Sequence, residues 1–142
     1  MNKITIVYWS LTGNTEKMAR LIKKGAESAG AEVKIKHVSE ASEDDLKDSG
    51  LLALGCPAMG VEELEENEFE PYVSSIESMV FGKKLALFGS YGWGDGEWMR
   101  NFSDRMRKNG AVLLGEGLIV KDSPQGADEE RCIAFGIEAA GF

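Results

Sequence analysis

Short apolar, β-branched runs alternate along the whole chain with amphipathic runs of helical spacing. Residues 4–8 read as a strand, and Met18 and Ile22 recur at helical spacing in residues 16–29. The other predicted strands are residues 32–38, 51–55, 84–89 and 111–120, the last with Gly115-Glu116-Gly117 as a candidate break. The other predicted helices are residues 42–48, 71–79, 97–108 and 128–140. Such alternation predicts an α/β fold in which helices cover both faces of a parallel sheet.

A parallel sheet of five strands joined by right-handed crossovers has few common strand orders, and 2-1-3-4-5 is favoured here. In this order, ligands bind at the carboxyl ends of the strands, where the order reverses between strands 1 and 3. Three loops, residues 10–15, 56–62 and 90–96, are therefore expected to meet at one site. The chain contains no linker or low-complexity tract, so we expect one domain over residues 1–142.

The acidic composition limits the classes of partner. A net charge of −8 at pH 7 argues against nucleic acid and against anionic membranes, because both require basic surfaces. It favours partner proteins with basic surfaces. The sequence has no apolar run near the ~20 residues of a membrane span and no signal-peptide pattern. Cys56 and Cys132 lack metal-binding spacing, so we expect reduced thiols, no metal and a cytoplasmic protein.

The loop after the first predicted strand has the composition of a phosphate site. Residues 10–15 read Ser-Leu-Thr-Gly-Asn-Thr and lead into a helix, whose free N–H groups and dipole favour an anion. The loop has Asn14 where a Walker loop has Lys, and Gly13 is its only glycine. Neither nucleotide hydrolysis nor a dinucleotide therefore fits. These residues predict a phosphomonoester that is held by neutral donors and left intact.

The other two loops predict a flat ligand. Residues 56–62 read Cys-Pro-Ala-Met-Gly-Val-Glu, and residues 90–96 read Ser-Tyr-Gly-Trp-Gly-Asp-Gly. Glycines around Trp93 and beside Met59 allow the backbone to approach a ligand closely, next to large apolar side chains. A mononucleotide cofactor fits all three loops, with its phosphate on the first loop and its ring system between the other two.

Together, the three loops resemble those of the short-chain, clostridial-type flavodoxins. The motifs that carry the resemblance are Ser-x-Thr-Gly-Asn-Thr at 10–15, Gly-Cys-Pro-Ala-Met-Gly at 55–60 and Leu-Phe-Gly-Ser-Tyr-Gly-Trp-Gly-Asp-Gly at 87–96. The resemblance runs the whole length of the chain. It implies a flavodoxin-like three-layer sandwich, for which the strand order given above is a known feature. It also implies non-covalently bound FMN and a low-potential one-electron carrier, not an enzyme, that shuttles between quinone, neutral semiquinone and hydroquinone states.

The resemblance further implies a set of cofactor-binding residues and no catalytic ones. The phosphate would be bound by Ser10, Leu11, Thr12, Gly13, Asn14 and Thr15. The ring would be held by Pro57, Ala58, Met59, Gly60, Glu62, Ser90, Tyr91, Gly92, Trp93, Gly94 and Asp95. Trp93 and Met59 would stack on the two ring faces. Glu62 would accept a hydrogen bond from flavin N3–H, and the carbonyl of Gly60 would accept one from N5–H.

An FMN-dependent oxidoreductase of the quinone or azo reductase type is the alternative with this fold. Such enzymes often carry a catalytic His or Tyr, and the only histidine, His37, lies in the second predicted strand. We therefore expect a monomeric carrier whose redox partners, reductases and electron acceptors, have basic surfaces. The acidic residues 62–70 fit either a docking surface for them or a solvated helix face. Tyr91 and Trp98 fit either the core or the rim of the site.

Overall fold

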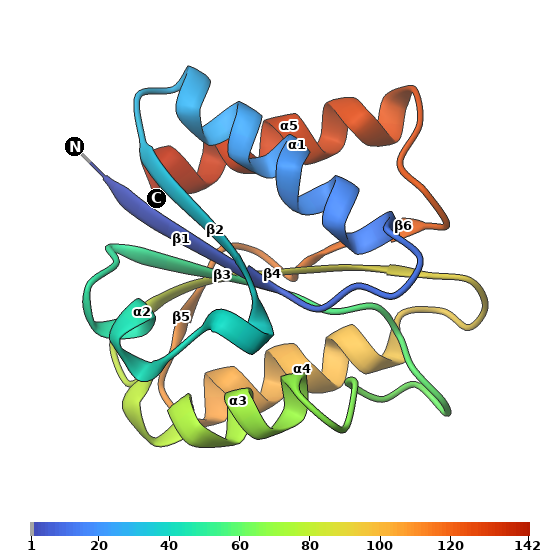
Figure 1. Cartoon of the computed structure of the whole chain (residues 1–142), viewed down its shortest axis with the longest axis horizontal. Coiled ribbons are helices and arrows are strands. Elements are labelled where there is room, and N and C mark those ends of the chain that lie inside the picture. The colour runs from blue at the N-terminus through green and yellow to red at the C-terminus, as the bar shows by residue number, and fades with distance from the viewer. Residues whose placement is uncertain (1) are drawn as a thin grey trace.

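The strands of the central sheet run parallel in the order β2-β1-β3-β4-β5 in the computed structural model, which describes residues 2–142 (Figure 1). A further strand, β6, also pairs with β4. The predicted strand order and the flavodoxin-like α/β fold class are therefore confirmed. The strands are β1 (Lys3–Tyr8), β2 (Glu32–His37), β3 (Leu51–Gly55), β4 (Lys84–Tyr91), β5 (Val112–Leu113) and β6 (Leu118–Lys121).

The fifth predicted strand is divided at its glycines into β5 and β6. β5 pairs with the start of β4, whereas β6 pairs with residues 88–91 at its end. Between them, Gly115 and Gly117 have φ angles of 62° and 94°. Glycine adopts such angles without a steric penalty, so the chain leaves the sheet and returns to it. This return extends β4 to Tyr91, two residues past the predicted end, because Tyr91 pairs with Lys121.

Helices cover both faces of the sheet, as predicted. One face is covered by α1 and α5, and the opposite face by α3 and α4 (Figure 1). The helices are α1 (Asn14–Ser28), α2 (Glu43–Lys47), α3 (Phe69–Ile76), α4 (Glu97–Lys108) and α5 (Ala127–Gly141), with 3-10 turns η1 (Val38–Glu40) and η2 (Glu77–Met79). Within residues 2–142, none of these helices combines the length and the apolar character that crossing a membrane requires.

The sheet separates two apolar cores. β3 is buried along its whole length, and its side chains point alternately into the two cores. Leu51 and Ala53 pack in the core under α1 and α5, and Leu52 and Leu54 pack in the core under α3 and α4. Successive side chains of a strand point to opposite faces, so a central parallel strand must be apolar at every position. This requirement explains why residues 51–55 form an uninterrupted apolar run.

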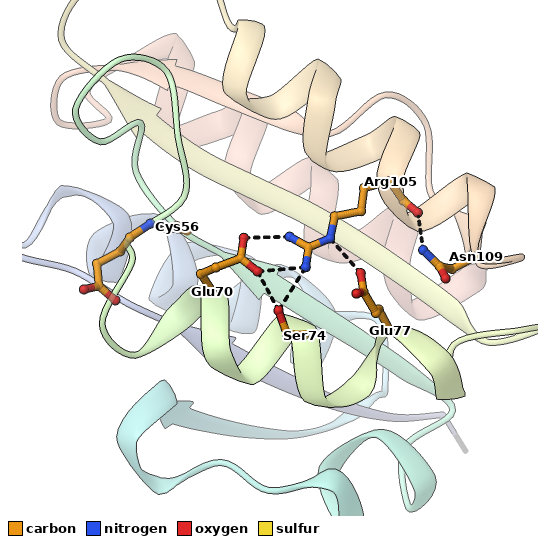
Figure 2. Close-up of polar contacts among 7 residues, drawn as sticks. Cys56, Glu70, Ser74, Glu77, Arg105 and Asn109 are labelled. Atoms are coloured by element: carbon orange, nitrogen blue, oxygen red, sulfur yellow. Dashed lines mark hydrogen bonds and ion pairs between the residues drawn. The ribbon is translucent and has the colours of Figure 1, made fainter.

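Arg105 ties α3 to α4 (Figure 2). Its Nη1 and Nη2 atoms each donate to one carboxylate oxygen of Glu70 at 2.7 Å, and its Nε donates to Glu77 Oε2 at 2.7 Å. Nη2 also donates to Ser74 Oγ at 3.2 Å. Two-pronged pairing of this kind fixes orientation as well as adding energy. The cluster therefore holds together the two helices that follow the second and third loops of the predicted site, α3 after a further six residues and α4 directly.

Candidate functional site

The three predicted loops meet at the carboxyl ends of β1, β3 and β4, around a cavity of about 180 Å³. Most of the predicted residues line it, together with one residue from the segment after β6. The lining consists of Ser10, Leu11, Thr12, Asn14, Thr15, Pro57, Ala58, Met59, Ser90, Tyr91, Gly92 and Asp122. The predicted residues outside the lining are Gly13, Gly60, Glu62, Trp93, Gly94 and Asp95. The topology thus brings into contact loops that lie far apart in the sequence.

The first loop closes on the N-terminus of α1. Gly13 caps this helix with a φ of 96°, a left-handed conformation that favours glycine. Ser10 Oγ accepts hydrogen bonds from the N–H groups of Gly13 at 3.2 Å and Glu16 at 3.3 Å. The N–H groups of Asn14 and Thr15 belong to the first turn, where no helical carbonyl is available to them. The loop contains no cationic side chain, so neutral donors and the helix dipole make this end of the cavity suited to an anion.

Thr15 connects the first loop to the end of β4. Its side chain is 1% exposed, and Thr15 Oγ1 lies 3.0 Å from Ser90 Oγ, with the two hydroxyls sharing a hydrogen bond. Ser90 N–H also donates to Thr15 Oγ1 at 3.4 Å. A buried hydroxyl pair that is fully satisfied holds its surroundings rigidly. The two residues therefore fix the first and third loops relative to each other under the cavity.

The second loop carries a tight turn between Met59 and Glu63. The N–H group of each of these residues donates to the carbonyl of the other at 2.8 Å. At the tip, Gly60 has a φ of 50° and Val61 is 81% exposed. Met59 is half-buried and lines the cavity. The turn therefore presents a flexible apolar side chain to the cavity and exposes its backbone at Gly60.

Glu62 links the second loop to the third. Glu62 Oε2 accepts a hydrogen bond from the Trp98 N–H, in the first turn of α4, at 2.9 Å. Its other oxygen, Oε1, lies against Gly94, where a Cβ atom would come within 1.9 Å of it. Trp98 itself is 1% exposed, and its ring N–H donates to the Cys56 carbonyl at 3.1 Å. Trp98 is thus a core residue, and Glu62 spans the gap between the loops.

Glu65 corrects the expectation that residues 62–70 form a solvated helix face. Its carboxylate is buried and accepts hydrogen bonds from the N–H groups of Asn67, Glu68 and Phe69 at 2.8 to 2.9 Å. Burial acts to raise the pKa of Glu65, but these three bonds outweigh it and the pKa is lowered. Glu65 therefore caps α3, which explains why that helix begins at Phe69 and not at residue 71.

Cys56 and Cys132 are free, buried thiols. Cys56 Sγ accepts a hydrogen bond from the Glu65 N–H at 3.4 Å. Burial raises the pKa of Cys56 to about 12 and that of Cys132 to about 11. Both side chains are therefore protonated near neutral pH, and neither is an activated nucleophile.

A rim of exposed apolar side chains comes from all three loops. Leu11 is 74% exposed, Val61 81% and Trp93 65%. Because the three loops converge on one cavity, these side chains are candidates for contact with a ligand or a partner. Trp93 is accordingly not a core residue.

Asp122 is the site residue that sequence reasoning missed. It follows β6 directly and lines the cavity, and its N–H donates to the Tyr91 carbonyl at 2.8 Å. The available signal was its position after the second half of the divided strand, since every such carboxyl end lies at the same edge of the sheet. His37, by contrast, stacks edge-on against Tyr8 with ring centroids 5.5 Å apart and does not line the cavity. Residues 2–142 contain no cluster of His, Cys, Asp and Glu side chains that could hold a metal ion.

Comparison with known proteins agrees with this geometry. Residues 6–136 match the family described as Flavodoxin. The chain is 53% identical over 135 residues to a flavodoxin of Clostridium beijerinckii, covering 95% of this chain and 97% of that protein. It is 44% identical to a flavodoxin of Megasphaera elsdenii, covering 96% and 98%.

Solved structures show the same likeness in three dimensions. The solution structure of two-electron reduced Megasphaera elsdenii flavodoxin superposes with a TM-score of 0.89 at 41% identity, covering 98% of this chain and 99% of that one. The crystal structure of oxidised Flavodoxin 2 from Bacillus cereus gives 0.86 at 32% identity, covering 98% of each chain. Sequence, fold and loop composition agree over nearly the whole length. This chain therefore belongs to the flavodoxin family, whose members are FMN-binding electron carriers and not enzymes.

Proposed function

We propose that this chain carries single electrons on one FMN, held without a covalent bond in the cavity between its three loops. In this proposal residues 10–15 bind the phosphate, and Met59 and Trp93 lie on opposite sides of the ring. The observation that carries it is the cavity itself, which joins neutral anion donors at the N-terminus of α1 to apolar side chains from two other loops. FMN has the same two parts, a phosphate and a flat aromatic ring.

The chemistry of the donors fits a phosphate that is bound and not transferred. The first loop offers N–H groups, hydroxyls and the dipole of α1, but no lysine, arginine or nucleophile. Ser10 Oγ accepts hydrogen bonds from the N–H groups of Gly13 and Glu16, and these bonds within the loop hold its backbone in place. An ordered site loses little conformational entropy on binding, which supports tight binding without a covalent link.

The charges around the cavity favour a low reduction potential. FMN supplies reversible one-electron chemistry, and added electrons bring negative charge to its ring. Loops 10–15, 56–62 and 90–96 hold no Lys or Arg, while Glu62, Asp95 and Asp122 stand in or beside them. Negative groups near a site disfavour the addition of more negative charge. The apolar Met59 and Trp93 strengthen the effect because they lower the local dielectric constant.

We further propose basic-surfaced redox partners that approach the apolar rim of Leu11, Val61 and Trp93. The net charge of −8 supports this choice, because opposite charges speed encounter and orient the two proteins. Residues 1–142 would act as one monomeric domain in the cytoplasm, where a reducing environment suits the free thiols of Cys56 and Cys132. Sedimentation of the FMN-loaded protein at several concentrations tests the monomer.

Titration of the FMN-free protein with FMN tests the proposal. We expect one FMN per chain and two separate one-electron steps in a dithionite titration followed by absorption. Incubation with NADH alone should give no steady-state oxidation, whereas addition of a flavodoxin reductase should allow electron flow. A protein that binds no FMN would overturn the proposal, and rapid NADH oxidation without a reductase would favour the oxidoreductase alternative.

A further inference from the structure

A second cavity, of about 280 Å³, lies beside the second loop of the site. Its volume is at the bottom of the roughly 300–1,000 Å³ range of small-molecule pockets, which suits one long side chain better than a cofactor. Met59 lines both this cavity and the cavity proposed for FMN, so it forms a wall between them. We call the second cavity the Trp9 slot, and its lining consists of Trp9, Met59, Gly60, Glu63, Leu64, Glu65, Glu66 and Asn67.

Two hydrogen bonds hold Trp9 on one side of the slot. Its backbone N–H donates to the Gly55 carbonyl at 2.9 Å, which continues the pairing of β1 with β3. Its indole Nε1–H donates to Glu68 Oε1 at 3.2 Å, and its ring is half-buried against the core under α3 and α4. The flat ring is therefore fixed in orientation where it lines the slot. An aromatic face of this kind attracts a cation, and a planar guanidinium also stacks on it.

The charged side chains of the slot are all acidic. Glu63 and Glu66 are exposed, whereas Glu65 is 5% exposed. Among the described residues that line the slot, none is Lys, Arg or His. Met59 and Leu64 add half-buried apolar surface. A positive charge suits the carboxylates and an apolar stem suits the rest, and a long basic side chain has both parts.

The segment 63–66 faces a guanidinium on its other side. Three of its residues also line a neighbouring cavity along α4, which contains Arg105. There Arg105 pairs with both carboxylate oxygens of Glu70 at 2.7 Å (Figure 2). The segment is thus an acidic ridge between two cavities, and one of them already holds an arginine of this chain. The slot offers similar carboxylates and no cation of its own among the described residues.

We propose that the Trp9 slot is an anchor for one arginine side chain of a redox partner, whose guanidinium stacks on Trp9 and pairs with Glu63 and Glu66. The inference rests on the proposed function, because that function supplies the basic-surfaced partner. Gly60 connects the slot to Val61 of the apolar rim, so an arginine seated here brings the adjoining surface of the partner over the rim. The anchor adds a fixed point of contact to the long-range attraction between opposite charges.

Titration with a single blocked amino acid tests the anchor. The probe is N-acetyl-arginine N′-methylamide, added to the FMN-loaded protein at low salt and followed by NMR at the indole N–H of Trp9 and the backbone N–H of Gly60. We expect both signals to shift with one Kd. The lysine analogue should bind more weakly, because an ammonium lacks the planar face that stacks on an indole. The citrulline analogue has nearly the same shape and no charge, and it should leave both signals in place.

Four variants locate the bound probe. Glu63→Gln and Glu66→Gln should each raise its Kd about threefold, the effect of losing one exposed ion pair. Trp9→Leu, followed at Gly60, should also raise it about threefold, because the cation loses its aromatic face. Glu97→Gln is the matched control, since it removes an exposed carboxylate that does not line the slot, and it should keep the wild-type Kd.

Three results would overturn the inference. One is equal affinity for the arginine and citrulline probes, and another is the absence of a shift at both Trp9 and Gly60. The third is equal weakening in Glu63→Gln and Glu97→Gln, which would show a general attraction to an acidic surface. The same titration of the FMN-free protein keeps the two proposals apart. A chain that binds the probe as expected but binds no FMN would refute the proposed function and leave the arginine site in place.

Discussion

Glu62 Oε2 accepts a hydrogen bond from the Trp98 N–H at 2.9 Å, and this single bond joins the second loop of the site to the first turn of α4. A carboxylate in this place satisfies an N–H group that has no partner within the helix. We expect Glu62→Ala to lower the free energy of unfolding of the FMN-free protein by about 1 kcal/mol, the usual cost of losing a helix cap. Urea denaturation measures this difference in the free energy of unfolding.

Two further variants distinguish the bond from a general effect of charge. Glu62→Gln keeps an acceptor oxygen and should lose less stability than Glu62→Ala. Glu63→Ala removes an exposed carboxylate from the next position, and its stability should stay close to that of wild type. Equal losses in Glu62→Ala and Glu63→Ala would show that the contact with Trp98 contributes nothing measurable.

Glu65→Gln tests the buried cap of α3. The folded-state pKa of Glu65 is lowered, so its carboxylate stabilises the fold above the unfolded pKa of about 4.3. That stabilisation is lost as the pH falls through the folded pKa. We expect the free energy of unfolding of wild type to exceed that of Glu65→Gln by about 1–3 kcal/mol at pH 7, because three N–H groups lose a charged acceptor. The difference should shrink in denaturation curves recorded at about pH 3. Glu66→Gln, at an exposed neighbouring position, should show no such pH dependence.

The contrast between these two glutamates shows what the sequence can and cannot predict. The buried central strand follows from local pattern, because an uninterrupted apolar run such as residues 51–55 is typical of a strand that is covered on both faces. The strand order follows from the alternation of strands and helices together with the few orders that such sheets adopt. The burial of Glu65 depends on where α3 begins, and a run of acidic residues gives no local sign that one of them turns inward. Asp122 escaped notice for a related reason. Its neighbours in the site come from three distant loops, and only the tertiary pairing of β6 with β4 brings it there.

Gly94→Ala should weaken FMN binding by disturbing the contact with Glu62. A Cβ atom at this position would lie 1.9 Å from Glu62 Oε1, and the φ of 86° disfavours alanine in any case. Gly82→Ala is the matched control, because Gly82 has a φ of 74°, no heavy atom within 4 Å of the added Cβ, and a position outside the three loops. We expect both variants to lose stability, but only Gly94→Ala to raise the Kd for FMN, measured by fluorescence titration. In a Glu62→Ala background, Gly94→Ala should raise the Kd by a smaller factor than it does in wild type, since the clashing oxygen is then absent.

Arg105→Lys tests the cluster that joins α3 to α4. Lysine keeps the charge but cannot contact both oxygens of Glu70 and also Glu77. We therefore expect the free energy of unfolding to fall by about 1 kcal/mol, a small amount because the side chains are partly exposed. Pairing with Arg105 lowers the pKa of Glu70, so the advantage of wild type should persist above about pH 4.3 and fade in acid. Arg107→Lys on the same helix alters exposed ion pairs and one exposed hydrogen bond to the Gly115 carbonyl, and it should lower the free energy of unfolding by less than about 0.5 kcal/mol. Equal losses in the two variants at pH 7 would rule out a special role for Arg105.

Trp93→Ala separates cofactor binding from folding. The side chain is 65% exposed, so its removal should leave the free energy of unfolding of the FMN-free protein almost unchanged. If the indole stacks on the ring, its loss removes about 1–1.5 kcal/mol of aromatic contact in addition to buried area, which corresponds to a Kd for FMN about tenfold higher. Fluorescence titration can follow the change, because Trp9 and Trp98 remain as reporters. Phe81→Ala removes another exposed aromatic ring, 83% exposed and outside the three loops, and it should leave the Kd at the wild-type value. A Kd for FMN that does not change in Trp93→Ala would mean that this side chain contacts the redox partner and not the ring of FMN.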